Sequence, residues 1–137
     1  MPGVKDWIVK ASGNLRAARK LIKEDDETLD LAAYATQQSA EKAFKAYLIF
    51  KKQTVIKTHD LEKLLVICMG LDQTFDRLQN EAAMLSPYAT YTRYPDDRFN
   101  ISRDEIVEAI KCAEKILKFV RAKIDDSSTP QLNLFES

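Results

Sequence analysis

The chain is poor in the residue types on which small β-rich, disulfide-bonded and metal-binding domains depend. Its 137 residues include only three glycines, four prolines, two cysteines and one histidine. So few glycines and prolines argue against a glycine-rich phosphate loop and against an all-β fold with many tight turns. Two cysteines and one histidine form neither a disulfide framework nor a cluster with metal-ligand spacing. We therefore expect no metal and no cofactor.

Long apolar runs and an excess of charge of one sign are also absent. No stretch approaches the roughly 18 uninterrupted apolar residues of a membrane span, and the N-terminus lacks the apolar core of a signal peptide. Basic and acidic side chains number 21 each, but residues 1–23 carry six basic and one acidic, whereas residues 24–30 carry five acidic. We expect one soluble, cytoplasmic domain without membrane contact, on which any polyanion site is local and assembled by folding.

Apolar residues recur at spacings of three and four along most of the chain, which predicts amphipathic helices. Thr58 is the expected N-cap of the third helix, Gly70 its C-terminal stop, and Pro87 the end of the fourth. Ser102 and Glu105 match a capping box at the start of the last helix. Five helices are expected, at about residues 4–23, 29–51, 59–69, 72–86 and 102–124. With no convincing strand, they predict an all-α helical bundle over residues 1–124 and a tail over residues 125–137.

A few residues have side chains suited to chemistry. His59, at the start of the third helix, is suited either to capping that helix or to meeting a phosphate or a proton. Tyr88, Tyr91 and Tyr94 lie in a segment with arginines, and either stack on bases or plug the end of the bundle. Cys68 and Cys112 lie in apolar helical stretches and are expected to be small buried hydrophobes rather than reactive thiols.

Three short motifs follow one another along the chain: QQSAEKAFKA at residues 37–46, KTHDL at residues 57–61 and TRYPD at residues 92–96. Together they closely resemble the HEPN (higher eukaryotes and prokaryotes nucleotide-binding) domain, and the resemblance covers residues 4 to about 124. It implies an up-and-down helical bundle that is usually dimeric and that binds nucleotides or cuts RNA. It also implies a small nucleotidyltransferase as the partner, in a toxin–antitoxin-type pair.

The chain departs from the family in one motif. Ribonuclease members use Arg-x(4–6)-His, with the two residues acting across a dimer cleft. The positions at that spacing from Arg93 hold Arg98, Phe99 and Asn100, and the only histidine, His59, lies upstream. The ribonuclease motif is therefore missing.

Two functions are open on this basis. The first is a homodimeric nucleotide- or RNA-binding module, in which Arg93 and Lys57 contact phosphate, Tyr94 stacks on a base, His59 donates a hydrogen bond and Asp96 orients Arg93. The second is a metal-independent ribonuclease with a rearranged site. There His59 is the general acid/base, and Arg93 stabilises the charge that develops on the phosphorane.

The C-terminal tail carries a separate motif after an acidic linker that contains serine, threonine and proline. Gln131, Leu132, Leu134 and Phe135 resemble the Gln-Leu-x-Leu-Phe peptide by which bacterial replication and repair proteins dock on the sliding clamp. The alternative is that the three apolar side chains fold back onto a groove of the same bundle or of its dimer mate.

Overall fold

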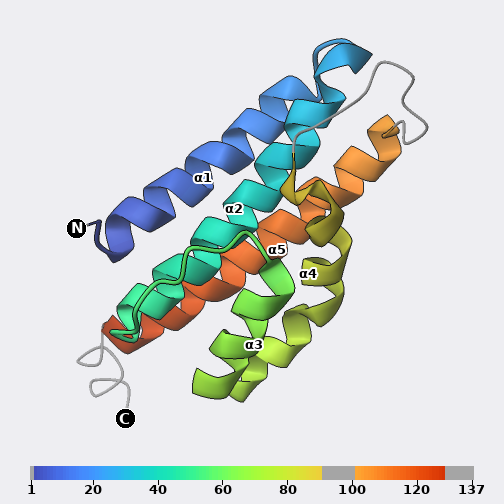
Figure 1. Ribbon diagram of the computed structural model, residues 1–137. Coiled ribbons are helices and arrows are strands. Elements are labelled where there is room, and N and C mark those ends of the chain that lie inside the picture. Colours follow the sequence, from blue (N-terminus) through green and yellow to red (C-terminus); the bar gives the residue numbers. More distant parts are fainter. Residues whose placement is uncertain (1, 91–100, 129–137) are drawn as a thin grey trace.

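The computed structural model describes residues 2–90 and 101–128, and these residues form a bundle of helices (Figure 1). The α-helices are α1 (Val4–Leu21), α2 (Leu29–Phe50), α3 (Leu61–Leu71), α4 (Gln79–Leu85) and α5 (Arg103–Ser128). Three short 3-10 segments join them: η1 (Asp26–Thr28), η2 (Gln73–Leu78) and η3 (Ser86–Ala89). The described residues contain no strand, and none of their helices is long and apolar enough to cross a membrane.

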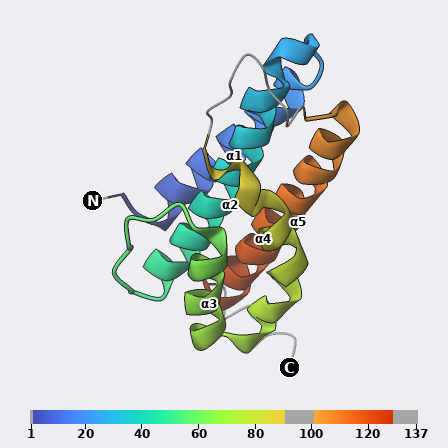
Figure 2. The ribbon, with the colours of Figure 1, turned by 45° about the vertical axis from the view of Figure 1, so that its right-hand side comes forward.

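Helix α2 lies at the centre of the bundle. Helices α1 and α5 pack along it, α3 packs against α2, and α4 packs against α5, α3 and α2 (Figures 1 and 2). Helix α1 runs antiparallel to α2, whereas α5 runs in the same direction as α2. Residues 51–60 form a connector that crosses the face of α2 before α3 begins. The all-α up-and-down bundle expected from the sequence is confirmed.

Helix α2 is enclosed on nearly all of its sides, with 16 of its 22 residues buried. Ala32, Ala35 and Ala43 are among them, and their small side chains permit a close approach of the neighbouring helices. A hydrogen bond also joins the two long helices α1 and α2, because Ser39 Oγ donates to the backbone oxygen of Ala11 at 2.8 Å.

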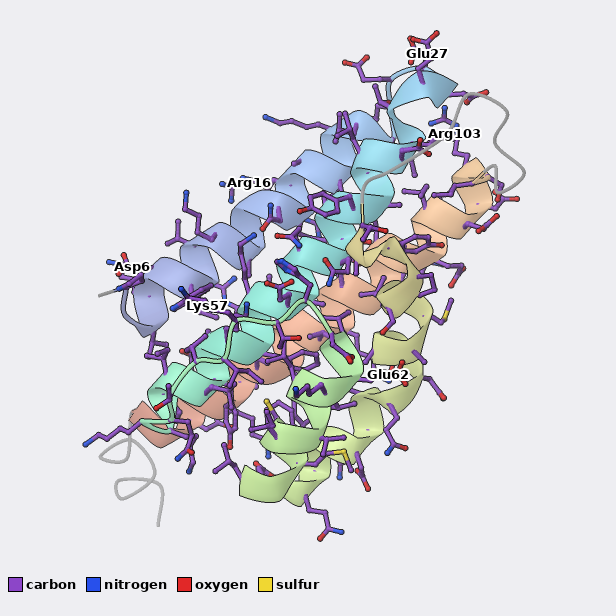
Figure 3. All side chains as sticks on the ribbon, in the orientation of Figure 1. Asp6, Arg16, Glu27, Lys57, Glu62 and Arg103 are labelled. Carbon is purple, nitrogen blue, oxygen red and sulfur yellow. The ribbon has the colours of Figure 1, made fainter. Side chains whose placement is uncertain are left out.

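The start of α5 is fixed to the turn between α1 and α2. Arg103 donates to the backbone oxygen of Ile22 and to Asp26 Oδ1, the latter at 2.9 Å; Figure 3 labels Arg103 at this end of the bundle. The expected capping box is present, since Ser102 N donates to Glu105 Oε1 at 3.2 Å and Glu105 N donates to Ser102 Oγ at 3.1 Å. Helix α5 therefore begins where the sequence indicates.

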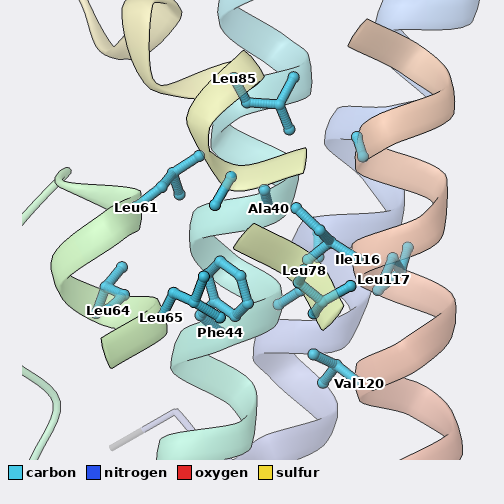
Figure 4. Packing of buried hydrophobic residues seen from close by; sticks show 14 of the residues in the cluster. Ala40, Phe44, Leu61, Leu64, Leu65, Leu78, Leu85, Ile116, Leu117 and Val120 are labelled. Carbon is cyan, nitrogen blue, oxygen red and sulfur yellow. The ribbon is translucent and has the colours of Figure 1, made fainter. Parts of the chain in front are cut away.

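The main core fills the space between α2, α5 and the α3–α4 side of the bundle (Figure 4). Phe75, in the 3-10 segment η2, is fully buried, and its ring lies 4.4 Å from that of Tyr47, 4.9 Å from that of Phe119 and 6.4 Å from that of Phe44 (centroid distances). Tyr88 is half-buried and packs against the core, as expected for a residue that plugs the bundle. Phe75 therefore anchors the short α3–α4 segment to the two long helices.

The N-terminus of α3 differs from the prediction. Asp60, not Thr58, is the N-cap: its Oδ1 accepts a hydrogen bond from Lys63 N at 3.1 Å. Thr58 Oγ1 instead accepts from Asp60 N at 3.2 Å, so Thr58 holds the residue that caps the helix. Both residue types are good N-caps, and the cap falls to the one whose extended backbone directly precedes the helix. His59 consequently lies outside α3.

Gly70 does not end α3, because the helix continues to Leu71 and Asp72 is its C-cap. A glycine stop requires the left-handed backbone conformation, which no described glycine adopts.

The expected helix at 72–86 begins instead as η2, whose first turn is closed by a hydrogen bond from Thr74 N to Asp72 Oδ1 at 3.0 Å. Only residues from Gln79 onward are α-helical. Helix α4 ends at Leu85, just before η3, which contains Pro87.

Helix α5 is longer than the sequence pattern indicates. It extends to Ser128, four residues beyond the expected end near Ile124. The acidic residues that read as a linker therefore form the last turn of α5. Polar and acidic residues are compatible with a helix end, so composition alone does not locate it.

We expect Phe75→Ala to lower the free energy of unfolding by about 3–5 kcal/mol, because it removes a buried ring that contacts three others. Urea denaturation followed by circular dichroism measures this. The control is Val66→Ala, since the Val66 side chain is 65% exposed and its truncation should change stability by less than about 0.5 kcal/mol. Equal effects of the two substitutions would contradict the anchoring role of Phe75.

Candidate functional site: a buried polar stripe and an exposed histidine

Helix α2 carries a row of polar side chains beneath the connector. We call this row the polar stripe; it consists of Gln37, Gln38, Glu41, Lys42 and Lys45. Residues at these spacings lie on one side of a helix. All except the half-buried Lys42 are buried. Buried polar and charged groups are stable only when they are paired, so the stripe must be a connected network.

Glu41 is the centre of this network. Its Oε2 lies 2.8 Å from Lys45 Nζ, and its Oε1 lies 2.8 Å from Nδ1 of His59. Burial by itself raises the pKa of Glu41, but the hydrogen bonds and positive charges of Lys45 and His59 outweigh that effect and leave the pKa below its ordinary value of 4.5. Glu41 is therefore a buried carboxylate that is ionised at neutral pH.

His59 is held by one hydrogen bond at its ring and one at its backbone oxygen, but its ring is open to solvent. Because the Glu41 carboxylate can only accept hydrogen bonds, Nδ1 of His59 carries the hydrogen between them. The backbone oxygen of His59 accepts a hydrogen bond from Gln37 Nε2 at 2.9 Å. The His59 side chain is nevertheless 68% exposed, whereas that of Glu41 is 4% exposed. The imidazole is thus oriented by a buried carboxylate and turns its remaining edge to solvent.

The other hydrogen bonds of the stripe fix the side-chain amides of Gln37 and Gln38 and link α2 to α1. Gln38 Nε2 donates to Gln37 Oε1 at 2.8 Å, and Lys42 Nζ donates to Gln38 Oε1 at 2.9 Å and to Asn14 Oδ1 at 3.1 Å. Burial lowers the pKa of Lys42. Lys45 lies over the ring of Trp7 on α1, with Nζ 5.9 Å from the ring centroid. These contacts leave little rotational freedom to the side chains that support His59.

Lys57 lies on the connector two residues before His59 and is exposed (Figure 3). It forms no ion pair with any residue that the structure describes. Lys57 and His59 therefore lie on the same short connector above the polar stripe. The other predicted ligand-binding residues, Arg93, Tyr94 and Asp96, lie outside the described residues.

The tail residues Gln131, Leu132, Leu134 and Phe135 also lie outside the described residues. Their docking on a sliding clamp or on the chain's own bundle stays a prediction.

Both cysteines are buried and free of disulfides, as expected. Burial raises the pKa of the Cys68 thiol to about 12 and also raises that of Cys112. Neither forms a thiolate at neutral pH, so neither is part of the site.

Sequence reasoning found His59 and Lys57 but gave no role to Glu41, Gln37 or Lys45. The signal was available in residues 37–46, where two glutamines, a glutamate and two lysines lie among alanines and a phenylalanine in a predicted helix. A charged residue in such a helix is expected to have a partner. The identity of the partner, 18 positions away in the connector, depends on the tertiary fold.

The arrangement is suited to contact an anionic ligand. An exposed imidazole edge can donate or accept a proton, and a neighbouring lysine supplies a positive charge for a phosphate. The buried carboxylate fixes the orientation of the imidazole, as second partners do for functional histidines. The described residues contain no group of three or more His, Cys, Asp or Glu side chains placed to hold a metal ion.

Fold and site together define a class of protein: an all-α helical bundle whose central helix carries a buried polar network that holds an exposed histidine. The HEPN domain family model matches residues 4–123, and the chain belongs to this family.

Two solved structures resemble the chain. ST0689, described as an archaeal HEPN homologue, has 27% sequence identity and a TM-score of 0.73. TT1696 from Thermus thermophilus has 32% identity and a TM-score of 0.73. In both cases the similarity covers 90% of this chain and 99% of the other. No curated protein sequence matches the chain.

We expect Glu41→Gln to destabilise the protein by about 3–5 kcal/mol at neutral pH, because it leaves the buried Lys45 ammonium without its anion. Urea denaturation at neutral pH measures the difference. The control is Glu108→Gln, which removes a carboxylate that is 56% exposed and should cost less than about 0.5 kcal/mol.

The pH dependence gives the same test a second readout. Because folding lowers the pKa of Glu41, its stabilisation is present above the ordinary value of 4.5 and is lost as pH falls through the lower folded value. The wild-type protein should therefore lose stability in acid more steeply than the Glu41→Gln variant. Parallel curves would show that the Glu41 carboxylate does not contribute to folding.

Proposed function

We propose that this HEPN domain binds a nucleotide or a segment of RNA at the connector above the polar stripe. The observation that carries the proposal is the contrast at His59, whose Nδ1 and backbone oxygen are fixed by buried side chains while the imidazole is 68% exposed. The folded protein already holds this solvent-exposed ring in one orientation. A ligand that contacts the ring therefore binds without a further loss of conformational entropy there. Lys57 supplies a phosphate contact beside it, and Arg93, Tyr94 and Asp96 complete the site.

The proposal includes a homodimer and a nucleotidyltransferase partner. The alanines of α2 are buried within the single chain, so a dimer would have to use another surface. Light scattering at micromolar concentration tests the dimer. Co-expression with a neighbouring nucleotidyltransferase gene, scored for growth arrest and for co-purification, tests the partner.

Fluorescence anisotropy with a labelled nucleotide and a labelled single-stranded RNA tests the binding function. Arg93→Ala should weaken binding by about 2–5 kcal/mol, because it removes a charged contact to phosphate. His59→Ala should also weaken binding. The control is Lys63→Ala, which removes an exposed positive charge from the first turn of α3, close to His59 in the chain.

Thermal unfolding of the same variants separates binding from folding. If Arg93→Ala or His59→Ala lowers the melting temperature and leaves affinity unchanged, the residue is structural. If neither probe binds the wild-type protein, the binding function is wrong.

The contact between His59 and Glu41 favours a second function, a metal-independent ribonuclease. A carboxylate that binds one nitrogen of an imidazole leaves the other nitrogen to exchange a proton with substrate, which is how general acid/base histidines are held. The reaction needs a positive group for the phosphorane charge, and Arg93 is the proposed one.

Incubation of structured and single-stranded RNA with the protein in the presence of a chelator tests this second function. The wild-type protein should cleave, and His59→Gln should reduce the rate by about 10²–10⁴-fold while anisotropy still reports binding. If the wild-type protein binds RNA but does not cleave it, the ribonuclease function is wrong and only the binding function remains.

A further inference from the structure

A second charged region lies on another face of the bundle, in a groove between α1 and α5. Leu15 and Leu117 form its floor, and the groove, which is open to solvent, has a volume of about 820 Å³. Small-molecule sites usually enclose roughly 300–1,000 Å³, so this volume is sufficient for a ligand. The rims carry Arg16 and Arg19 from α1 and Lys118 and Arg121 from α5.

The groove is separate from the polar stripe. On α1, Asn14 contacts Lys42 of the stripe, whereas Arg16 lines the groove. Two positions along a helix correspond to a rotation of about 200°, so these two side chains leave opposite sides of α1. A ligand in the groove therefore contacts neither His59 nor Glu41.

The cations of the groove differ from the other cations of α5. Four of the basic side chains on this helix outside the groove are paired with carboxylates: Arg103 with Asp26, Lys111 with Glu108, Lys115 with Glu81 and Lys123 with Asp72. Within the described part of the chain, Lys118 and Arg121 form no ion pair, and the same is true of Arg16 across the groove. The positive charge of α5 that is not neutralised by the protein is thus concentrated in the groove.

The ion pair between Arg19 and Glu114 fixes how the two rims face each other. Because α1 and α5 run antiparallel (Figure 1), residues later in α5 lie beside residues earlier in α1. Lys118 therefore lies across from Arg16, and Arg121 lies near Ser12, which also lines the groove. Arg16, Lys118, Arg121 and Ser12 thus line the middle of the groove.

Carboxylates limit the positive region at both of its ends. Glu114 lies at one end, where it neutralises Arg19, and Asp125 lies at the other. The distance from Ser12 to Arg19 is about 10 Å along the axis of α1. A positive region this short, bounded at one end by a neutral ion pair and at the other by a carboxylate, favours a compact anion over a long polyanion that continues past the carboxylates.

We propose that the groove between α1 and α5 is a second binding site that takes a compact run of phosphate groups, held by Arg16, Lys118 and Arg121. Each guanidinium group can donate two parallel hydrogen bonds to the oxygens of one phosphate, and the lysine adds a point charge. Such phosphates occur at the end of a nucleotide and in the backbone of a short oligonucleotide. The cations are exposed, so binding weakens as ionic strength rises.

Titration of ¹⁵N-labelled full-length protein, followed by NMR, tests the site with three probes: inorganic tripolyphosphate, ATP and a single-stranded hexanucleotide. The expected result is a saturable shift of the amide signals of Ser12, Arg16 and Arg121 with at least one probe. Response to tripolyphosphate and ATP identifies a terminal polyphosphate as the ligand, and response to the hexanucleotide alone identifies a backbone segment.

The variant Arg16→Ala/Arg121→Ala should weaken this binding by about tenfold or more, because it removes two charged hydrogen-bonding groups. The matched control, Lys63→Ala/Lys111→Ala, also removes two exposed positive charges from helices, but both lie outside the groove. Circular dichroism checks that both variants fold.

Three results of these titrations would overturn the proposal. They are no shift in the groove with any probe at millimolar concentration, equal loss of binding in the two double variants, and shifts confined to residues around His59. The last result leaves the function proposed for the polar stripe intact, so the two proposals fail separately. A groove that is closed by self-association, seen as dimer formation that Arg16→Ala/Arg121→Ala abolishes without any phosphate binding, would also overturn it.

Discussion

The buried carboxylate of Glu41 is the constraint on which the arrangement of this face of the bundle depends. An ionised group in the interior loses its hydration, and only close partners can compensate for that loss. One partner, Lys45, comes from the next turn of the same helix, so α2 alone can provide it. The other partner, His59, comes from the connector, so Glu41 binds the connector to α2 at one point. The position of the imidazole thus follows from the need to neutralise a charge on a different element.

The network around Glu41 also explains how α2 can be buried on almost all of its sides without being entirely apolar. One side carries Phe44 and Leu48 and packs into the main core. The polar stripe lies on another side, where Asn14, Trp7 and the connector cover it. Every described side-chain hydrogen bond of the stripe ends on a group that also positions α1 or the connector, or on a neighbour within the stripe. Polar contacts of this kind fix the register between neighbouring helices. Contacts between alanines alone would allow one helix to slide along the other.

The sequence predicted the long helices well because their signals are local. The apolar spacing in residues 4–21 and the Ser102–Glu105 capping box depend only on neighbours within one or two turns. The errors arose where two local signals compete. Thr58 and Asp60 are both able to cap a helix, and the choice between them depends on which residue directly precedes the first helical turn in the folded chain. Gly70 is tolerated inside α3 because the helix end is determined by Asp72, which also caps η2.

The candidate site was predictable only in part, for a related reason. His59 and Lys57 belong to one of the three motifs that together carried the resemblance to the HEPN family, which the family match confirms. The contact of His59 with Glu41 joins two motifs that are far apart in the sequence, and no periodicity connects them. The burial of Glu41 also depends on the path of the connector, which composition does not determine.

The two charged regions of the bundle differ in how their charge is balanced, and this difference separates their roles. In the polar stripe, Lys45 is neutralised by Glu41 within the protein, so what reaches solvent is an oriented imidazole with Lys57 beside it. In the groove, Arg16, Lys118 and Arg121 are exposed and have no carboxylate partner among the described residues. An internally balanced site recognises a ligand mainly by geometry, whereas an unbalanced one attracts it by charge. Because α1 separates the two regions, one bundle can present both without either altering the electrostatics that the other requires.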